Sequence, residues 1–307
     1  MSTSTATRYS TRELRAAAAA LAAGKFSTTA TRPSTPETAE DQDPRATLEV
    51  TAATEGERDR APRGDGDRPS PGATSAVSTE AGPLVRVRAA NAGAGASTIA
   101  LALADVADAA GIRTRVLDAA APEWSGLLGA TVTELGAAEG WRRGRRGDGV
   151  LIDRVEEPVR VPGEVPSPRS VDGVDLTVLD AGWSMRELAA SRAGSWVATT
   201  PARAEVLVTR PHGLALSQTE AALADLEDQL ARDGVVVVVV GAARWSDRDF
   251  APAGRLLRAA RQQEAVLFAP LLPAKALPGL GPDPLPKQLT SPSQRLLERI
   301  ATITGPL

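Results

Sequence analysis

A loop of small residues carries the clearest chemical signal in this sequence. It reads Asn91-Ala92-Gly93-Ala94-Gly95-Ala96-Ser97-Thr98 and lies between an apolar run and a helical segment. A glycine-bearing loop that leads into a helix directs several backbone N–H groups, and the positive end of the helix dipole, toward one point. We therefore expect this loop to favour an anion such as phosphate without help from any side chain.

The side chains of the loop depart from those of a standard P-loop. A P-loop adds a lysine for the β- and γ-phosphates and a Ser or Thr hydroxyl for Mg²⁺. Here Ser97 is present, but Ala96 occupies the lysine position. Since a charge-assisted contact to phosphate contributes about 1.5–3 kcal/mol, nucleotide binding can persist while efficient hydrolysis is not expected. The alternative is a relic loop that only turns a strand into a helix.

Two aspartates follow apolar runs that predict neighbouring strands. Asp118 ends the run that begins at Arg115, and Asp180 ends the run that begins at Leu176. Ligands bind at the carboxyl ends of strands in open α/β sheets, so both would be catalytic acids if the site is active, and Ser97 with Asp180 would hold Mg²⁺. The alternative is that the two aspartates cap loops or helix N-termini.

Two tryptophans follow the same strand ends. Trp124 comes after Asp118, and Trp183 comes after Asp180. They could rim the site or stack on a base, and the alternative is burial as docking aromatics.

An arginine cluster stands out in a chain whose formal net charge is only -3. Arg142, Arg143, Arg145 and Arg146 follow Trp141 directly. Such a patch could contact a protein partner, DNA or an anionic membrane, and the alternative is a solvated charge run. The single histidine, His212, lies between Pro211 and Gly213 and is expected to be a turn residue.

The elements that must position these residues alternate between short apolar runs and helical segments, which predicts a doubly wound, mostly parallel α/β sheet. The expected strands are Val85 to Ala89, Thr114 to Leu117, Leu176 to Leu179, Glu205 to Val208, Val235 to Val240 and Ala265 to Phe268. The six valines from Val235 to Val240 are typical of a strand that is covered on both faces.

Helix boundaries are also legible in the sequence. A helix is expected from Ser97 to about Ala110, ended by Gly111. Ser217 and Glu220 have the spacing of a capping box, and Ser291-Pro292 predicts the start of a last helix. Residues 141–172 interrupt the alternation and are expected to form an insertion, with short strands at Val150 to Asp153 and Val159 to Val161.

On these residues the chain resembles the ParA/MinD superfamily of P-loop ATPases, and within it the CpaE-like proteins. Their loop commonly reads close to Gly-Gly-Ala-Gly-Ala-Ser-Thr, and their strands resemble the runs that end at Asp118, Asp180 and Thr209. The resemblance implies a P-loop NTPase fold over residues 83–307, ATP and Mg²⁺ as the ligands, and a homodimer. The signature lysine of the family would stand at Asn91, so both of its lysines are absent.

The segment before this domain has a different composition. Residues 27–82 are rich in Ser, Thr, Pro, Gly and charged residues, which predicts a disordered linker. Residues 1–26 contain a short predicted helix with Ser10 and Glu13 in capping-box spacing. This helix is expected either to remain solvated and partly formed, or to fold when it docks on a partner.

Composition narrows the classes of function. The sequence has no cysteine and one histidine, so iron–sulfur centres, disulfide scaffolds and cysteine nucleophiles are excluded. Its longest apolar stretches, Ala16 to Ala23 and Val235 to Val240, are too short to span a bilayer. We expect a cytoplasmic protein, with peripheral attachment to a membrane as the alternative.

The favoured function is a non-hydrolysing regulatory or positioning factor. The resemblance implies a protein partner in a secretion, pilus or conjugation apparatus. Two alternatives stay open: an active ATP hydrolase for DNA or plasmid partition, and a purely structural adaptor.

Overall fold

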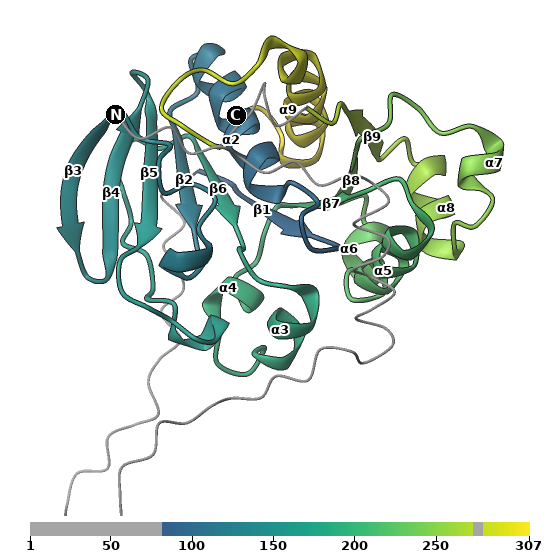
Figure 1. Ribbon diagram of the computed structural model, residues 1–307, viewed down its shortest axis with the longest axis horizontal. Helices are drawn as coiled ribbons and strands as arrows, with labels where there is room; N and C mark the ends of the chain where they lie inside the picture. Colours follow the sequence, from purple (N-terminus) through teal and green to yellow (C-terminus); the bar gives the residue numbers. More distant parts are fainter. Residues whose placement is uncertain (1–81, 273–278) are drawn as a thin grey trace, which may run out of the picture. The chain divides into compact units, whose positions relative to one another are not determined.

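The computed structural model describes residues 82–272 and 279–307. The predicted N-terminal helix within residues 1–26 and all but the last residue of the predicted linker lie outside these ranges. The described residues form a nine-stranded sheet with the order β3-β4-β5-β2-β6-β1-β7-β8-β9 (Figure 1). Its strands are β1 Leu84–Ala89, β2 Thr114–Asp118, β3 Thr133–Ala138, β4 Trp141–Arg146, β5 Val150–Val155, β6 Leu176–Asp180, β7 Ala204–Thr209, β8 Val235–Val240 and β9 Val266–Ala269.

The strands from β5 to β9 in the sheet order pair in parallel, and β3 and β4 pair antiparallel at one edge. The predicted doubly wound, mostly parallel α/β fold is therefore confirmed. The helices are α2 Ala96–Ala109, α3 Met185–Ala190, α4 Trp196–Thr199, α5 Gly213–Ala224, α6 Glu227–Ala231, α7 Asp247–Phe250, α8 Arg255–Gln262 and α9 Thr290–Thr304.

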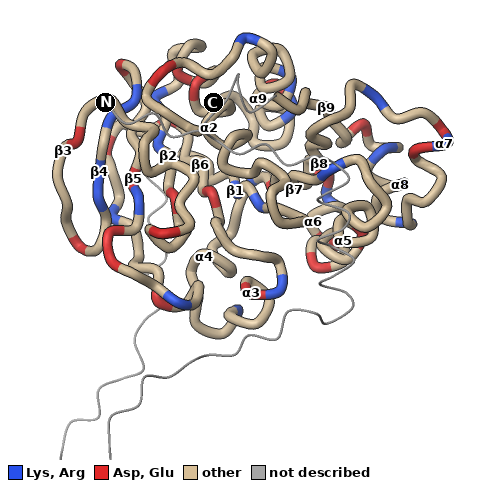
Figure 2. The backbone as a smooth tube through the Cα atoms, viewed as in Figure 1, with Lys and Arg blue, Asp and Glu red and all other residues tan. Residues whose placement is uncertain are grey.

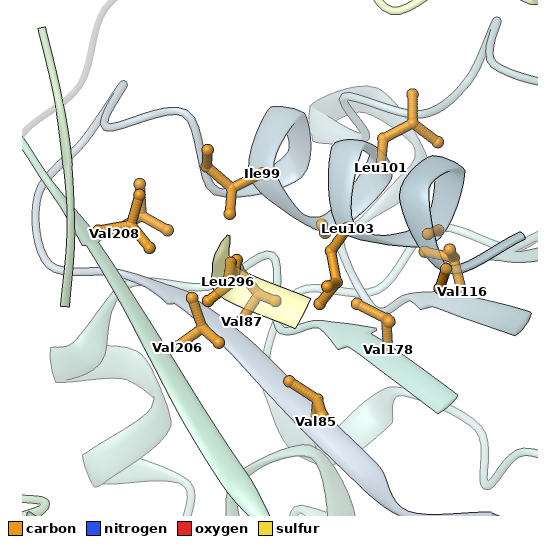
Figure 3. Packing of buried hydrophobic residues seen from close by; sticks show 14 of the residues in the cluster. Val85, Val87, Ile99, Leu101, Leu103, Val116, Val178, Val206, Val208 and Leu296 are labelled. Atoms are coloured by element: carbon orange, nitrogen blue, oxygen red, sulfur yellow. The ribbon is translucent and has the colours of Figure 1, made fainter. Parts of the chain in front are cut away.

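Helices cover both faces of the sheet. Helices α2 and α9 lie together on one face, where Leu103 and Leu296 pack on valines of the central strands (Figure 3). On the other face α5, α6 and α8 cover β7 to β9, while α3 and α4 lie under β2 and β6. All six valines of β8 are buried, and they alternate between the two cores. The prediction of a strand covered on both faces is confirmed.

The central strand β1 carries two buried cations. Arg86 and Arg88 point to the face of the sheet opposite α2, and Glu205 of β7 is the register partner of Arg86. The Glu205 carboxylate accepts from Arg88 Nε at 2.9 Å and lies 3.5 Å from Arg86 Nε. Arg86 also donates to the carbonyl oxygens of Val197 and Ala198, both at 2.8 Å. Burial lowers the pKa of Arg86 to about 10, so this cluster is a costly structural device rather than an exposed charge.

The antiparallel edge differs from the sequence prediction. Strands β3 and β4 form a hairpin that begins at Thr133, earlier than the expected insertion over residues 141–172. The strand predicted at Val150 to Asp153 is confirmed as part of β5. The strand predicted at Val159 to Val161 is wrong, because a short 3₁₀ turn, Pro162–Glu164, follows there instead and Val159 packs into the core next to α3 and α4.

The helix predictions have mixed outcomes. The first helix ends before Gly111 as expected, and α9 contains the predicted Ser291-Pro292 start. The capping box at Ser217 and Glu220 is wrong, because α5 already begins at Gly213 with His212 as its N-cap. The carboxylate of Glu220 instead accepts from the backbone N–H groups of Leu256 and Leu257, at 2.8 and 3.0 Å. It therefore caps a different helix, α8.

Candidate functional site

The loop of residues 91–98, called the phosphate loop below after its predicted ligand, leads from β1 into α2 at the carboxyl edge of the sheet. Gly93 and Gly95 have φ values of 68° and 100°, which only glycine adopts without strain. Gly95 is the N-cap of α2, and no side chain caps this helix. Within residues 82–272 and 279–307, the N–H groups of residues 95–98 have no hydrogen-bond acceptor. The loop therefore presents a set of free donors at a helix N-terminus, which suits an anion.

Strand β7 holds the loop from one side. The side chain of Asn91 donates to the hydroxyl of Thr209 at 2.9 Å, and Thr209 in turn lies 2.6 Å from the hydroxyl of Thr219 on α5. The next residue, Arg210, donates from Nε and Nη2 to the carbonyl oxygen of Gly93, at 3.1 and 2.7 Å. A cation therefore lies on the loop although the loop itself has none.

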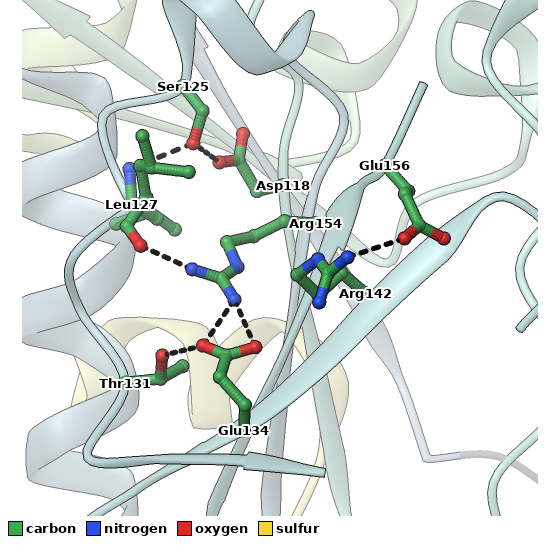
Figure 4. A network of polar contacts seen from close by, with 9 residues as sticks. Asp118, Ser125, Leu127, Thr131, Glu134, Arg142, Arg154 and Glu156 are labelled. Carbon is green, nitrogen blue, oxygen red and sulfur yellow. Dashed lines mark hydrogen bonds and ion pairs between the residues drawn. The ribbon is translucent and has the colours of Figure 1, made fainter. Parts of the chain in front are cut away.

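Asp118 and Asp180 lie side by side, as the sequence predicts. They are register partners at the ends of β2 and β6, and neither has any exposed surface. Asp118 accepts from the hydroxyl of Ser125 (Figure 4). It also accepts from the backbone N–H of Ala120. Burial raises the pKa of Asp118, and these hydrogen bonds offset part of the rise. Asp118 therefore holds the connection after β2, which is the capping role given above as its alternative.

Asp180 has no such partners. Within the described residues neither of its carboxylate oxygens accepts a hydrogen bond of normal geometry. Burial and then the neighbouring Asp118 charge raise the pKa of Asp180 to about 7, although the Ser97 hydroxyl and the Gly182 N–H face it and offset part of this rise. A buried carboxylate without partners is expensive unless a cation compensates it. Asp180 is therefore the residue of this site that most needs a ligand.

The connection after β2 also packs against Ser97. A Cβ atom added at Gly126 would lie 2.9 Å from both Cβ and Oγ of Ser97. Only glycine fits this contact without displacing the serine. Ser97 is thus held between the start of α2 and this connection, close to Asp180.

These residues line one cleft of about 1450 Å³. The whole loop from residue 91 to 98 borders it, together with Asp180, Arg210 and the two tryptophans. Trp124 is 81 % exposed, so the prediction of a buried docking aromatic is wrong for this residue. Trp183 is half-buried and donates from Nε1 to the carbonyl oxygen of Ala119 at 2.7 Å. Both aromatic side chains rim the cleft, which is large enough for a nucleotide.

The arginine cluster forms β4, which is largely blue in Figure 2. Arg146 is buried and bonds to both oxygens of Asp105 and to the carbonyl oxygens of Ala130, Gly281 and Asp283. Arg143 bonds to both oxygens of the buried Asp153, at 2.6 and 2.8 Å. Arg142 pairs with Glu156 at 2.6 Å, as Figure 4 shows. The surface patch predicted for Arg142, Arg143, Arg145 and Arg146 is therefore wrong for Arg146, whose charge is compensated inside the protein.

The sequence matches no protein-family model and no curated protein. Among solved structures it is similar to the MinC:MinD cell division complex of Aquifex aeolicus, with a TM-score of 0.47 and 14% identity over 70% of this chain and 96% of that chain. It is also similar to the cell division ATPase MinD of Pyrococcus furiosus, with a TM-score of 0.46 and 19% identity over 72% and 99% of the two chains. The ParA family ATPase of Chlorobium tepidum gives a TM-score of 0.45 and 11% identity over 71% and 99%. At TM-scores below 0.5, any functional assignment must rest on the residues of this chain.

Sequence reasoning missed Arg210 as a site residue. The signal was present, because Arg210 comes two residues after the end of the predicted strand Glu205 to Val208 and so belongs to the carboxyl edge of the sheet. Its proximity to Gly93, however, depends on the pairing of β1 with β7, which the sequence does not reveal.

Among the described helices, none combines the length and hydrophobicity that crossing a bilayer requires.

Proposed function

We propose that this domain binds a nucleoside di- or triphosphate with Mg²⁺ in the cleft and does not hydrolyse it efficiently. The observation that carries the proposal is Asp180, a fully buried carboxylate next to the phosphate loop and Ser97, whose oxygens accept no hydrogen bond of normal geometry within the described residues. Carboxylate and hydroxyl oxygens suit Mg²⁺, which proteins typically hold through one or two such groups together with substrate phosphates. The donor set therefore fits the metal that the loop implies.

The roles of the residues follow from their positions. The free N–H groups from Gly95 to Thr98 would bind phosphate oxygens, and Ser97 and Asp180 would hold the metal. A bound Mg²⁺ supplies charge that neutralises the phosphates. Asp118 keeps the connection after β2 in place through Ser125. Trp124 and Trp183 offer apolar surface at the rim of the cleft for a base.

Slow or absent hydrolysis follows from the residue types. Phosphoryl transfer depends on electrostatic stabilisation of the charge that develops on the transferred group. Ala96 places a methyl group where a P-loop carries its lysine, and Asn91 is likewise uncharged. We therefore infer a nucleotide-dependent regulatory or positioning role rather than efficient ATP hydrolysis. Its partner would be a protein of a secretion, pilus or conjugation apparatus, which the CpaE-like resemblance of the loop supports.

Tryptophan fluorescence tests the binding proposal, because Trp124 is exposed at the cleft. The protein is titrated with ADP and ATP, each with Mg²⁺ and with EDTA. Asp180→Asn should weaken the Mg²⁺-dependent binding at least about tenfold, since a charge-assisted contact contributes about 1.5–3 kcal/mol. The matched control is Asp225→Asn, because Asp225 lines the same cleft but pairs with Arg192. The control should bind as the wild type does.

Two results would contradict the proposal. The absence of any saturable change at millimolar nucleotide would remove nucleotide binding altogether. Phosphate release is measured on the same samples, and steady turnover that is lost in both Ser97→Ala and Asp180→Asn would instead establish an active ATPase.

A further inference from the structure

Arg210 contacts the phosphate loop from the neighbouring strand β7. Residues 91–98 include no lysine or arginine. Arg210 reaches the loop from β7 and donates two hydrogen bonds to the Gly93 carbonyl oxygen. Its backbone is well fixed, because the preceding Thr209 is fully buried and bonded to Asn91. The end of strand β7 therefore positions the guanidinium group at the loop.

This guanidinium is not neutralised by an acidic group. Within residues 82–272 and 279–307, no carboxylate lies within 4.0 Å of Arg210. Other arginines of the domain are used differently, since Arg88, Arg115 and Arg146 each bond to a carboxylate. Arg210 instead donates two of its five N–H groups to a neutral carbonyl oxygen. Its charge remains available to a ligand.

The position of this charge matches the chemistry of the cleft. Arg210 borders the same cleft as the loop and Asp180. A guanidinium group binds phosphate oxygens in a fork geometry, and these bonds are about twice as strong as bonds between neutral groups. Exchange of the Gly93 carbonyl oxygen for a phosphate oxygen is therefore favourable, and it requires only rotation of the half-buried Arg210 side chain, which borders the cleft.

We propose that Arg210 is the phosphate-contacting cation of this site and replaces the lysine that the loop lacks. It would leave the Gly93 carbonyl oxygen and contact the terminal phosphates of the bound nucleotide. This inference rests on the proposed function, since it assigns a residue to the same site. It also predicts that Arg210 distinguishes a diphosphate from a monophosphate.

The test compares the affinities of the full chain for AMP, ADP and inorganic pyrophosphate, each with Mg²⁺. Arg210→Gln should weaken the binding of ADP and of pyrophosphate about tenfold, because one charge-assisted bond to phosphate is lost. The loss stays near the lower end of the range for such bonds, since wild-type Arg210 must first give up its bonds to Gly93. AMP should change much less. Arg210→Lys keeps the charge without the fork and should fall between the wild type and Arg210→Gln. Arg186→Gln is the matched control, since Arg186 borders the same cleft from α3.

The outcomes separate this inference from the proposed function. If the wild type binds no nucleotide, the proposed function fails and the inference falls with it. If the wild type binds ADP but Arg210→Gln binds it as tightly as Arg186→Gln does, only the inference is overturned. An equal loss for AMP and ADP also overturns it, because a residue that merely braces the loop would affect both ligands alike. A selective loss for ADP and pyrophosphate supports it.

Discussion

Substitution of Asp180 by asparagine should stabilise the unliganded protein above neutral pH, and this advantage over the wild type should shrink as the pH falls. The pKa of this carboxyl is raised from 3.8 to about 7 in the fold. The folded state therefore binds one proton more than the unfolded state between these values, so stability falls as the pH rises through this window and stays low above it. Ionisation of a carboxyl with this pKa costs the fold about 4 kcal/mol in total.

The expected effect on the asparagine variant is smaller than this total. An asparagine at position 180 carries no charge at any pH, but its buried amide must still find hydrogen-bond partners, which costs about 1–3 kcal/mol where it fails. The pH dependence is insensitive to that constant cost. Between pH 5 and pH 8 the free energy of unfolding of Asp180→Asn, measured against that of the wild type, should rise by about 3 kcal/mol.

Urea denaturation at pH 5 and pH 8, followed by far-UV circular dichroism, measures this difference. Asp225→Asn is the control, because Asp225 lies at the cleft but is partly exposed and paired with Arg192. A difference between the two pH values that is the same for both variants would refute the reasoning. It would mean that Asp180 is solvated or paired in solution, and the main argument for a cation at this position would then be lost.

Two further substitutions test the buried charges with the same denaturation assay. Glu205→Gln removes the carboxylate that pairs with both buried arginines of β1, and should destabilise by about 3 kcal/mol, while Glu227→Gln at an exposed pair should have no measurable effect. Arg146→Ala should also destabilise by about 3 kcal/mol, because it leaves Asp105 and three carbonyl oxygens without their donor, whereas Arg142→Ala should stay within about 0.5 kcal/mol. Equal effects within either pair would contradict the assignment of buried and exposed roles.

The central strands could be predicted from the sequence because the residue types within each strand are enough to indicate its burial. Six consecutive valines in β8 indicate burial on both faces wherever the strand lies in the sheet. The same reasoning placed Asp118 and Asp180 at neighbouring strand ends, since a strand that ends in an acid is visible in the sequence itself. Only the structure shows that Asp118 accepts from the Ser125 hydroxyl, whereas the oxygens of Asp180 accept no hydrogen bond of normal geometry from the described residues.

Strand β4 could not be predicted because the groups that compensate its charges lie in other parts of the sequence. A run of four arginines in five positions is typical of a solvated surface, and nothing within the run indicates burial. The carboxylates that compensate it, Asp105 and Asp153, come from α2 and β5. Arg210 was missed for the same reason, since its contact with Gly93 joins residues far apart in the chain. Charged side chains are therefore the least predictable part of this fold.

The distribution of charge also indicates how the proposed site must work. A P-loop lysine offsets the phosphate charge directly, but here the loop offers only backbone N–H groups, and Arg210, which bonds to the Gly93 carbonyl oxygen, comes from outside the loop. The same cleft contains Asp180, with Asp118 behind it. Phosphates in this loop would face Asp180, whose carboxyl group loses its proton near neutral pH. Without a divalent cation, like charges would repel each other in a desolvated site. Nucleotide binding should therefore depend on Mg²⁺ more strongly here than in a site with a lysine, and this dependence should grow from pH 6 to pH 8 as Asp180 ionises.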